Sequence, residues 1–177
     1  MDRSARPIDG SRAPDGAGAR APAQASTAAV RDAVDILARA TADEAAAGEA
    51  RERYRDRTMP RLEADARIAP LLAQDELVVA VRRRVVFDRR RPESRTVAPR
   101  GLAGDLYLTS RRLVLVGRLM LSFGLGDIEQ VVLSGERLLL VIRDGTGVAL
   151  GVAQPRLLRV EIAAARAYAR ERSAGPA

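Results

Sequence analysis

The sequence predicts a mainly β domain that is closed by one C-terminal helix and preceded by a helical segment. Seven short apolar segments between residues 77 and 152 have the composition or the alternation of strands. Most links between them are too short for the crossovers that parallel strands need, so the sheet is expected to be antiparallel. An amphipathic segment then begins at Pro155 and supplies the closing helix.

The N-terminal part of the chain reads as a tail followed by helices. Residues 1–26 are rich in Pro, Gly, Ala, Ser and Arg and hold almost no large apolar side chain, which predicts a disordered tail. Apolar residues recur at helical spacing over Thr27–Ala47, and Pro60 is expected to open a second, short helix that Pro70 ends. The predicted organisation is a tail at 1–26, a helical segment at 27–70, the β domain at 71–172 and a tail at 173–177.

The strands are bounded by residues typical of turns. Asp144-Gly145 is the clearest hairpin signal, and Thr109–Arg112 is expected to reverse the chain. Leu138–Ile142 is apolar on both faces, so the final helix is expected to cover its second face. The predicted strands are Leu77–Phe87, Leu102–Thr109, Leu113–Gly117, Leu119–Phe123, Ile128–Leu133, Arg137–Arg143 and Gly147–Val152.

The composition excludes most catalytic and metal-binding chemistry. The chain of 177 residues contains no cysteine and no histidine, which removes disulfides, thiolate sites, the commonest metal ligand and the commonest general base. It contains no lysine either, so a phosphate-binding loop of the Walker type is not possible. We therefore expect a protein that is not an enzyme and that holds no metal and no cofactor.

The net charge of +7 comes from the β domain. From residue 69 to the end the chain has 18 arginines and 11 acidic residues, whereas residues 28–68 have 8 arginines and 9 acidic residues. Arginine replaces lysine throughout, as GC-rich coding produces, so the arginine content alone is weak evidence for phosphate recognition.

Three stretches of the β region resemble a known family. Leu72–Val78, Gly104–Leu113 and Leu125–Val131 are similar to segments of GRAM and bacterial pleckstrin-homology-like (PH-like) domains, and the resemblance covers roughly residues 71–172. It implies a seven-stranded, partly open antiparallel barrel capped by one helix. Members of this family bind phosphoinositides, other lipid head groups or peptides.

The resemblance also implies where a ligand would bind. The family places basic residues on the first two strands and on the loop between them, but Leu102–Thr109 contains none. Strand alternation is expected to place two of the candidate arginines, 82 and 84, on one face, and the alternative is a basic loop that is merely solvated. The candidate ligand-binding residues are Arg82, Arg84, Arg89, Arg90, Arg91, Arg95 and Arg100.

Three functions are compatible with these residues. The leading hypothesis is a non-catalytic binding or scaffold module for a partner protein or for itself, with Val30, Val34 and Leu37 either packing on the chain's own barrel or forming the interaction face of the first helix. The alternative is association with anionic membrane lipid, although no exposed apolar wedge accompanies the arginines. Non-specific nucleic-acid binding is the third, and it lacks stacking aromatic residues. With neither a secretory signal nor a membrane span, the expected location is the cytoplasm, or the membrane periphery for the lipid hypothesis.

Overall fold

The computed structural model describes residues 21–56, 58–90 and 101–174. The chain divides into two compact units between Leu37 and Ala38. The sheet, the C-terminal helix and the second part of the first helix belong to the unit that begins at Ala38, so this unit starts well before the predicted domain boundary at residue 71.

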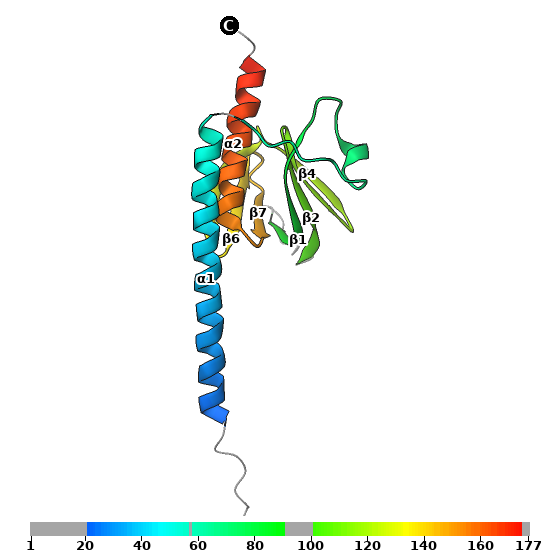
Figure 1. Cartoon of the computed structure of the whole chain (residues 1–177). Helices are drawn as coiled ribbons and strands as arrows, with labels where there is room; N and C mark the ends of the chain where they lie inside the picture. The colour runs from blue at the N-terminus through cyan, green and yellow to red at the C-terminus, as the bar shows by residue number, and fades with distance from the viewer. Residues whose placement is uncertain (1–20, 57, 91–100, 175–177) are drawn as a thin grey trace, which may run out of the picture. The chain divides into compact units, whose positions relative to one another are not determined.

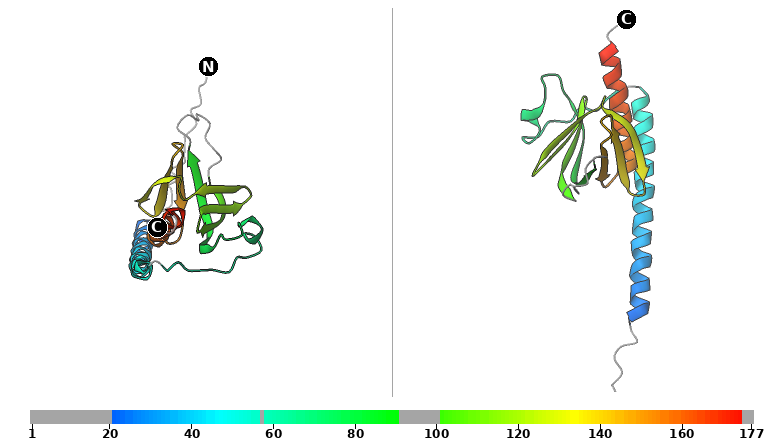
Figure 2. Two further views of the ribbon diagram at one scale, coloured as in Figure 1. Left: turned by 90° about the horizontal axis from the view of Figure 1, so that it is seen from above. Right: turned by 180° about the vertical axis from the view of Figure 1, so that it is seen from behind.

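All seven predicted strands are present and form one antiparallel sheet in the order β4-β3-β2-β1-β7-β6-β5. The sheet curls around a core, and β1 joins its two halves by pairing with both β2 and β7 (Figure 1, Figure 2). The predicted antiparallel sheet is thereby confirmed. The strands are β1 Val78–Arg90, β2 Leu102–Thr109, β3 Arg112–Gly117, β4 Met120–Gly124, β5 Ile128–Ser134, β6 Arg137–Ile142 and β7 Gly147–Gly151.

The core lies between the inner face of the sheet and the helix α2, Pro155–Ala174. Alternate residues of β6, among them Leu138 and Leu140, point inward and are almost fully buried. Leu158 and Ile162 of α2 are fully buried in the same cluster. The helix therefore closes the barrel from its inner side.

The prediction that the final helix covers the second face of β6 is wrong. Leu139 and Val141, which alternate with the core residues, are only half-buried and lie outside the core cluster that contains α2. A curled sheet presents one concave face, and the helix fills it, so the convex face of β6 stays partly in solvent.

Two glycines lie where the backbone requires them, one at a close approach between two strands and one in the predicted Asp144-Gly145 turn. A Cβ atom on Gly104 would lie 2.8 Å from the carbonyl oxygen of Val116 on the neighbouring strand β3, so only glycine fits there. Gly145 has φ of 77° and donates its N–H to the carbonyl of Ile142, which closes the β6–β7 hairpin.

The first helix, α1 (Ala21–Arg55), is longer than predicted, because it begins before Thr27 and continues through Gly48. Its later turns dock on the domain. The carboxylate of Asp43 accepts hydrogen bonds from the backbone N–H groups of Arg156 (2.8 Å) and Leu157 (3.0 Å), and so caps the start of α2 from another helix. From Ala38 onward α1 runs alongside α2 (Figure 1).

The short helix predicted to begin at Pro60 is absent. Residues 58–68 form an irregular strap that crosses the outer face of the sheet, and only a 3-10 turn, Ala69–Leu71, follows it. Ile68 is fully buried there with Tyr107 and Val114 in a second apolar cluster. Packing of Ile68 on the sheet thus overrides the local helical pattern.

Candidate functional site

Arg82, the first candidate ligand-binding residue, is held inside the fold. Its Nη2 atom lies 2.6 Å from Oε2 of Glu161 on α2, and the two side chains are only 14% and 10% exposed. Burial raises the pKa of Glu161, while the charge of Arg82 and the hydrogen bond that it donates lower it. The pair joins β1 to α2; Nη1 of Arg82 donates to the carbonyl of Val81 (3.1 Å), whereas its buried Nε has no acceptor among the described residues.

Arg84 does not share a face with Arg82, contrary to the alternation that was expected. The pairing register of β1 shifts between Arg82 and Val85, and Arg84 adopts φ of 56°, in the left-handed region that non-glycine residues rarely enter. Its backbone N–H donates to Oδ1 of Asp105 at 3.2 Å, and its side chain is exposed. Asp105 of β2 therefore holds this bulge in place.

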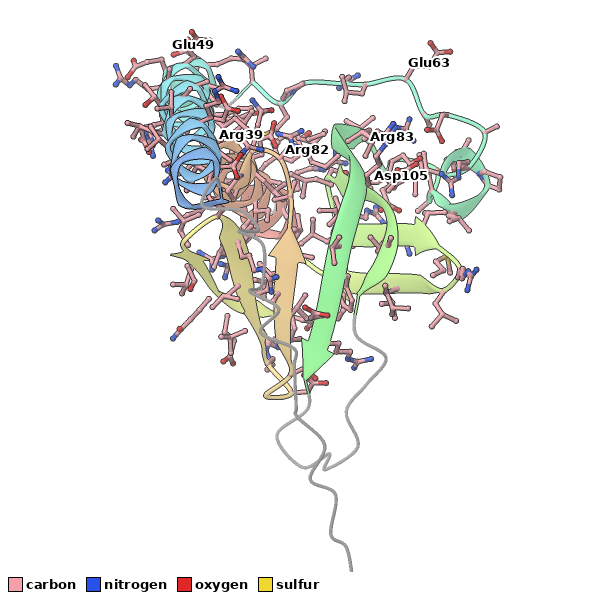
Figure 3. The ribbon with its side chains drawn as sticks, turned by 90° about the horizontal axis from the view of Figure 1, so that it is seen from below. Arg39, Glu49, Glu63, Arg82, Arg83 and Asp105 are labelled. Atoms are coloured by element: carbon pink, nitrogen blue, oxygen red, sulfur yellow. The ribbon has the colours of Figure 1, made fainter. Side chains whose placement is uncertain are left out.

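Arg83, which the sequence analysis did not nominate, is the centre of a polar network under the strap. It donates to Asp65 (2.8 Å) and Asp105 (2.7 Å), and Tyr107 also donates to Asp65 (2.8 Å). Hydrogen bonds from Arg83 and then from Tyr107 lower the pKa of Asp65 to about 2. Figure 3 shows Arg83 beside Asp105, with Arg82 turned toward the helices. The network fastens the strap to the sheet.

Arg89 lies apart from both Arg82 and Arg84, at the opening of the barrel. It lines a cavity of 450 Å³ together with residues of β4 and of the β6–β7 hairpin, among them Phe123 and Asp144. Its Nε atom is buried and has no hydrogen-bond acceptor among the described residues. The side chain of Arg90 and all of Arg91, Arg95 and Arg100 lie outside the described part of the chain. The candidates whose side chains are described, Arg82, Arg84 and Arg89, are thus not brought together.

The sequence analysis missed an exposed apolar tip on the β3–β4 hairpin. Leu119 and Met120 are 54% and 58% exposed, next to the exposed Arg118. The register pairs Gly117 with Gly104, near the start of β2, so this tip lies at the end of the barrel where β2 begins. Leu119 and Met120 were predicted to belong to a strand, which gave no reason to expect them in solvent.

The candidate interaction face of α1 is exposed. Val30, Val34 and Leu37 are 60%, 59% and 68% exposed. Ile36, 47% exposed, lies on another side of the same helix. An exposed apolar face of this kind is typical of a helix that binds another helix.

The described part of the chain offers neither a metal centre nor a membrane-spanning helix. In residues 21–56, 58–90 and 101–174, no group of three or more acidic side chains is arranged to hold a metal ion. No helix within these ranges combines the length and the hydropathy needed to cross a bilayer.

No family model and no curated protein sequence matches the chain. Among solved structures, the Vps36 N-terminal PH domain is similar at 19% identity and a TM-score of 0.44, covering 64% of this chain and 95% of that domain. The PH domain of USP37 is similar at 16% identity and a TM-score of 0.36, over 51% of this chain and 96% of that domain. The C-terminal domain of an unknown protein from Leishmania infantum is similar at 11% identity and a TM-score of 0.40, over 52% and 85%.

These likenesses are too weak to assign the fold, which rests on the topology of the chain itself. Seven antiparallel strands form a curled sheet around a core that one C-terminal helix closes. These are the features that the sequence analysis predicted, and the chain has a PH-like fold.

Proposed function

We propose that the chain is a non-catalytic protein-binding module in which the apolar face of α1 contacts a helix of a partner, a second copy of the chain included. The apolar face consists of Val30, Val34 and Leu37. Their exposure carries the proposal, because the free energy falls when a partner removes exposed valine and leucine side chains from water.

The spacing of the apolar face suits a helical partner. Its three residues are separated by four and then three positions, which is the alternation of a coiled-coil seam. Ala33 and Ala38 flank the seam and are small enough to allow a second helix to approach closely. Full burial of one such side chain is worth about 1.5–3 kcal/mol, so a seam this short supports a dissociation constant on the order of micromolar to millimolar.

Sedimentation velocity over a range of protein concentrations tests the homotypic form of this contact. We expect the wild-type chain to shift toward a dimer as concentration rises, and V34E/L37E to stay monomeric, because charged side chains cannot be buried in the seam. The matched control is I36E. Ile36 is also exposed but lies at least about 100° around the helix from each residue of the apolar face.

The control decides how a loss of association is interpreted. If I36E abolishes association as completely as V34E/L37E, the effect comes from added charge on the helix and the proposed contact surface is wrong. Circular dichroism of each variant checks that the helical content is unchanged.

A second function, association with an anionic membrane surface, is favoured by the tip of the β3–β4 hairpin. Leu119 and Met120 are exposed apolar side chains beside the cationic Arg118, the combination that inserts into a lipid interface and attracts its charge. A chain that used this tip would lie in the cytoplasm at the membrane periphery. The bound fraction would fall as salt screens the arginines.

Co-sedimentation with anionic and neutral liposomes tests this function at low and physiological salt. We expect L119S/M120S to reduce binding to anionic vesicles several-fold, while V132S, which removes another half-exposed apolar side chain from β5, leaves it unchanged. Equal binding by both variants would show that the tip does not insert. No binding to anionic vesicles at low salt would exclude this function.

A further inference from the structure

A basic groove lies on the far side of β3 from the hairpin tip. It has a volume of 730 Å³, and its walls come from the β2–β3 turn, the β4–β5 turn and the last turns of α2. Leu125 and Ala169 also line it. Four arginines and one acidic residue line it, namely Arg111, Arg166, Arg170, Arg172 and Asp75.

Asp75 orients two of the four arginines. Its Oδ1 atom lies 2.5 Å from Nη2 of Arg111, and its Oδ2 atom lies 3.4 Å from Nη2 of Arg172. A single carboxylate thus holds guanidinium groups from the β2–β3 turn and from α2. Because it neutralises only one of the four positive charges, the groove keeps a surplus of positive charge.

The other two arginines have no acidic partner among the described residues. Arg166 and Arg170 are one helical turn apart on α2, where like charges repel. The Nε atom of Arg166 is buried and has no acceptor among the described residues. Burial lowers the pKa of Arg166, and the positive charge of Arg170 lowers it further. An anion that both residues could contact would relieve this repulsion.

We propose that the groove binds a small, soluble phosphate-bearing molecule, with Arg166 and Arg170 donating hydrogen bonds to its phosphate oxygens. A phosphate group has three acceptor oxygens and close to two charges, so one group satisfies two neighbouring guanidinium forks. The volume is larger than a single phosphate needs and lies in the range of small-molecule sites, about 300–1,000 Å³. Ala169, which is half-buried, offers a small apolar contact to the remainder of the ligand.

The surroundings of the groove favour a soluble source of the phosphate over a lipid head group. No large apolar side chain that lines the groove in the described part of the chain is strongly exposed, since Leu125 is only 1% exposed. The exposed pair Leu119 and Met120 lies beyond the opposite end of β3. A membrane-bound ligand would need an apolar rim beside the groove, which a free ligand does not.

Isothermal titration calorimetry of the full chain with inorganic pyrophosphate, at low and at physiological salt, tests the proposal. We expect saturable binding that R166Q/R170Q weakens at least about tenfold, because charge-assisted hydrogen bonds to phosphate are lost. The variant D75N should bind more tightly than the wild type, because Arg111 and Arg172 are then free to turn toward the ligand. The matched control is R159Q, which removes an exposed arginine of the same helix outside the groove.

Each remaining outcome decides against the proposal. Equal weakening by R159Q and R166Q/R170Q would show that only the overall charge matters. Absence of saturable pyrophosphate binding at low salt would overturn the site. If vesicles containing phosphatidic acid bind through Arg166 and Arg170 while pyrophosphate does not, the ligand is a lipid head group and the soluble source is wrong. Thermal unfolding checks that each variant is folded.

Discussion

Replacing Glu76 with alanine is expected to lower the free energy of unfolding of the domain by about 3 kcal/mol, because it leaves a partly buried cation without its partner. The Glu76 side chain is 1% exposed and accepts hydrogen bonds from Arg112 (Nε, 2.9 Å), Thr109 (Oγ1, 2.7 Å) and the backbone N–H of Ala73 (3.1 Å). Burial would raise the pKa of Glu76, but hydrogen bonds from Arg112 and Thr109 hold it below its ordinary value. Urea-induced unfolding measures the loss.

Two variants place the Glu76 result in context. E76Q keeps a side chain of the same size and an acceptor oxygen, so it should lose less stability than E76A. D75N removes the neighbouring carboxylate, whose ion pairs are half-exposed and worth at most about 1 kcal/mol. A loss under about 1 kcal/mol for E76A would show that the buried network contributes little to stability.

The pair of Arg82 and Glu161 should show the second large effect. R82M alone is expected to cost about 3 kcal/mol, because it strands a buried carboxylate, whereas R82M/E161L should be close to the wild type because two apolar side chains fill the same space. A double-mutant cycle of unfolding free energies measures the coupling between the two residues. Additive losses would contradict a direct interaction.

The raised pKa of Glu161 adds a pH dependence to the same experiment. A carboxyl whose pKa is higher in the folded than in the unfolded state binds its proton more tightly when folded, so stability rises as pH falls through the folded pKa. Without Arg82 the carboxyl has lost the charge that lowered its pKa. The deficit of R82M should therefore shrink between pH 7 and pH 5, and a deficit independent of pH would contradict this account.

The β strands could be predicted because their signals are local. Alternation, turn residues and short links define each of them, and the predicted and observed bounds of β2 are identical. The strap could not be predicted in the same way. Pro60 suggests a helix start, whereas the observed path of the strap depends on Ile68 reaching a cluster formed by strands that come later in the chain.

The candidate site was less predictable than the fold, because neighbouring arginines on one strand form ion pairs with different acidic residues. Arg82 is taken by Glu161 and Arg83 by Asp65 and Asp105, and these acidic residues are 79, 18 and 22 positions away in the sequence. The spacing of residues in the sequence does not predict contacts over such separations. The groove beside α2 was not predicted, since the turns that complete it are distant in sequence from the helix.

The helix that carries Val30, Val34 and Leu37 could be predicted from the sequence, whereas what covers this face could not. Helical spacing identifies Val30, Val34 and Leu37, but spacing alone cannot distinguish a face that packs on its own domain from one that a partner covers. The exposure of these residues favours the partner.

Photo-crosslinking in the host cell tests the proposed contact of α1 most directly. A photoreactive benzoylphenylalanine replaces Val34 in one variant and Ile36 in a matched control, since both side chains are exposed on the same helix. The account predicts a specific crosslinked product, to a second copy or to another protein, from position 34 and not from position 36. Equal products from both positions, or none from position 34, would contradict the claim that this face of α1 is a protein-binding surface.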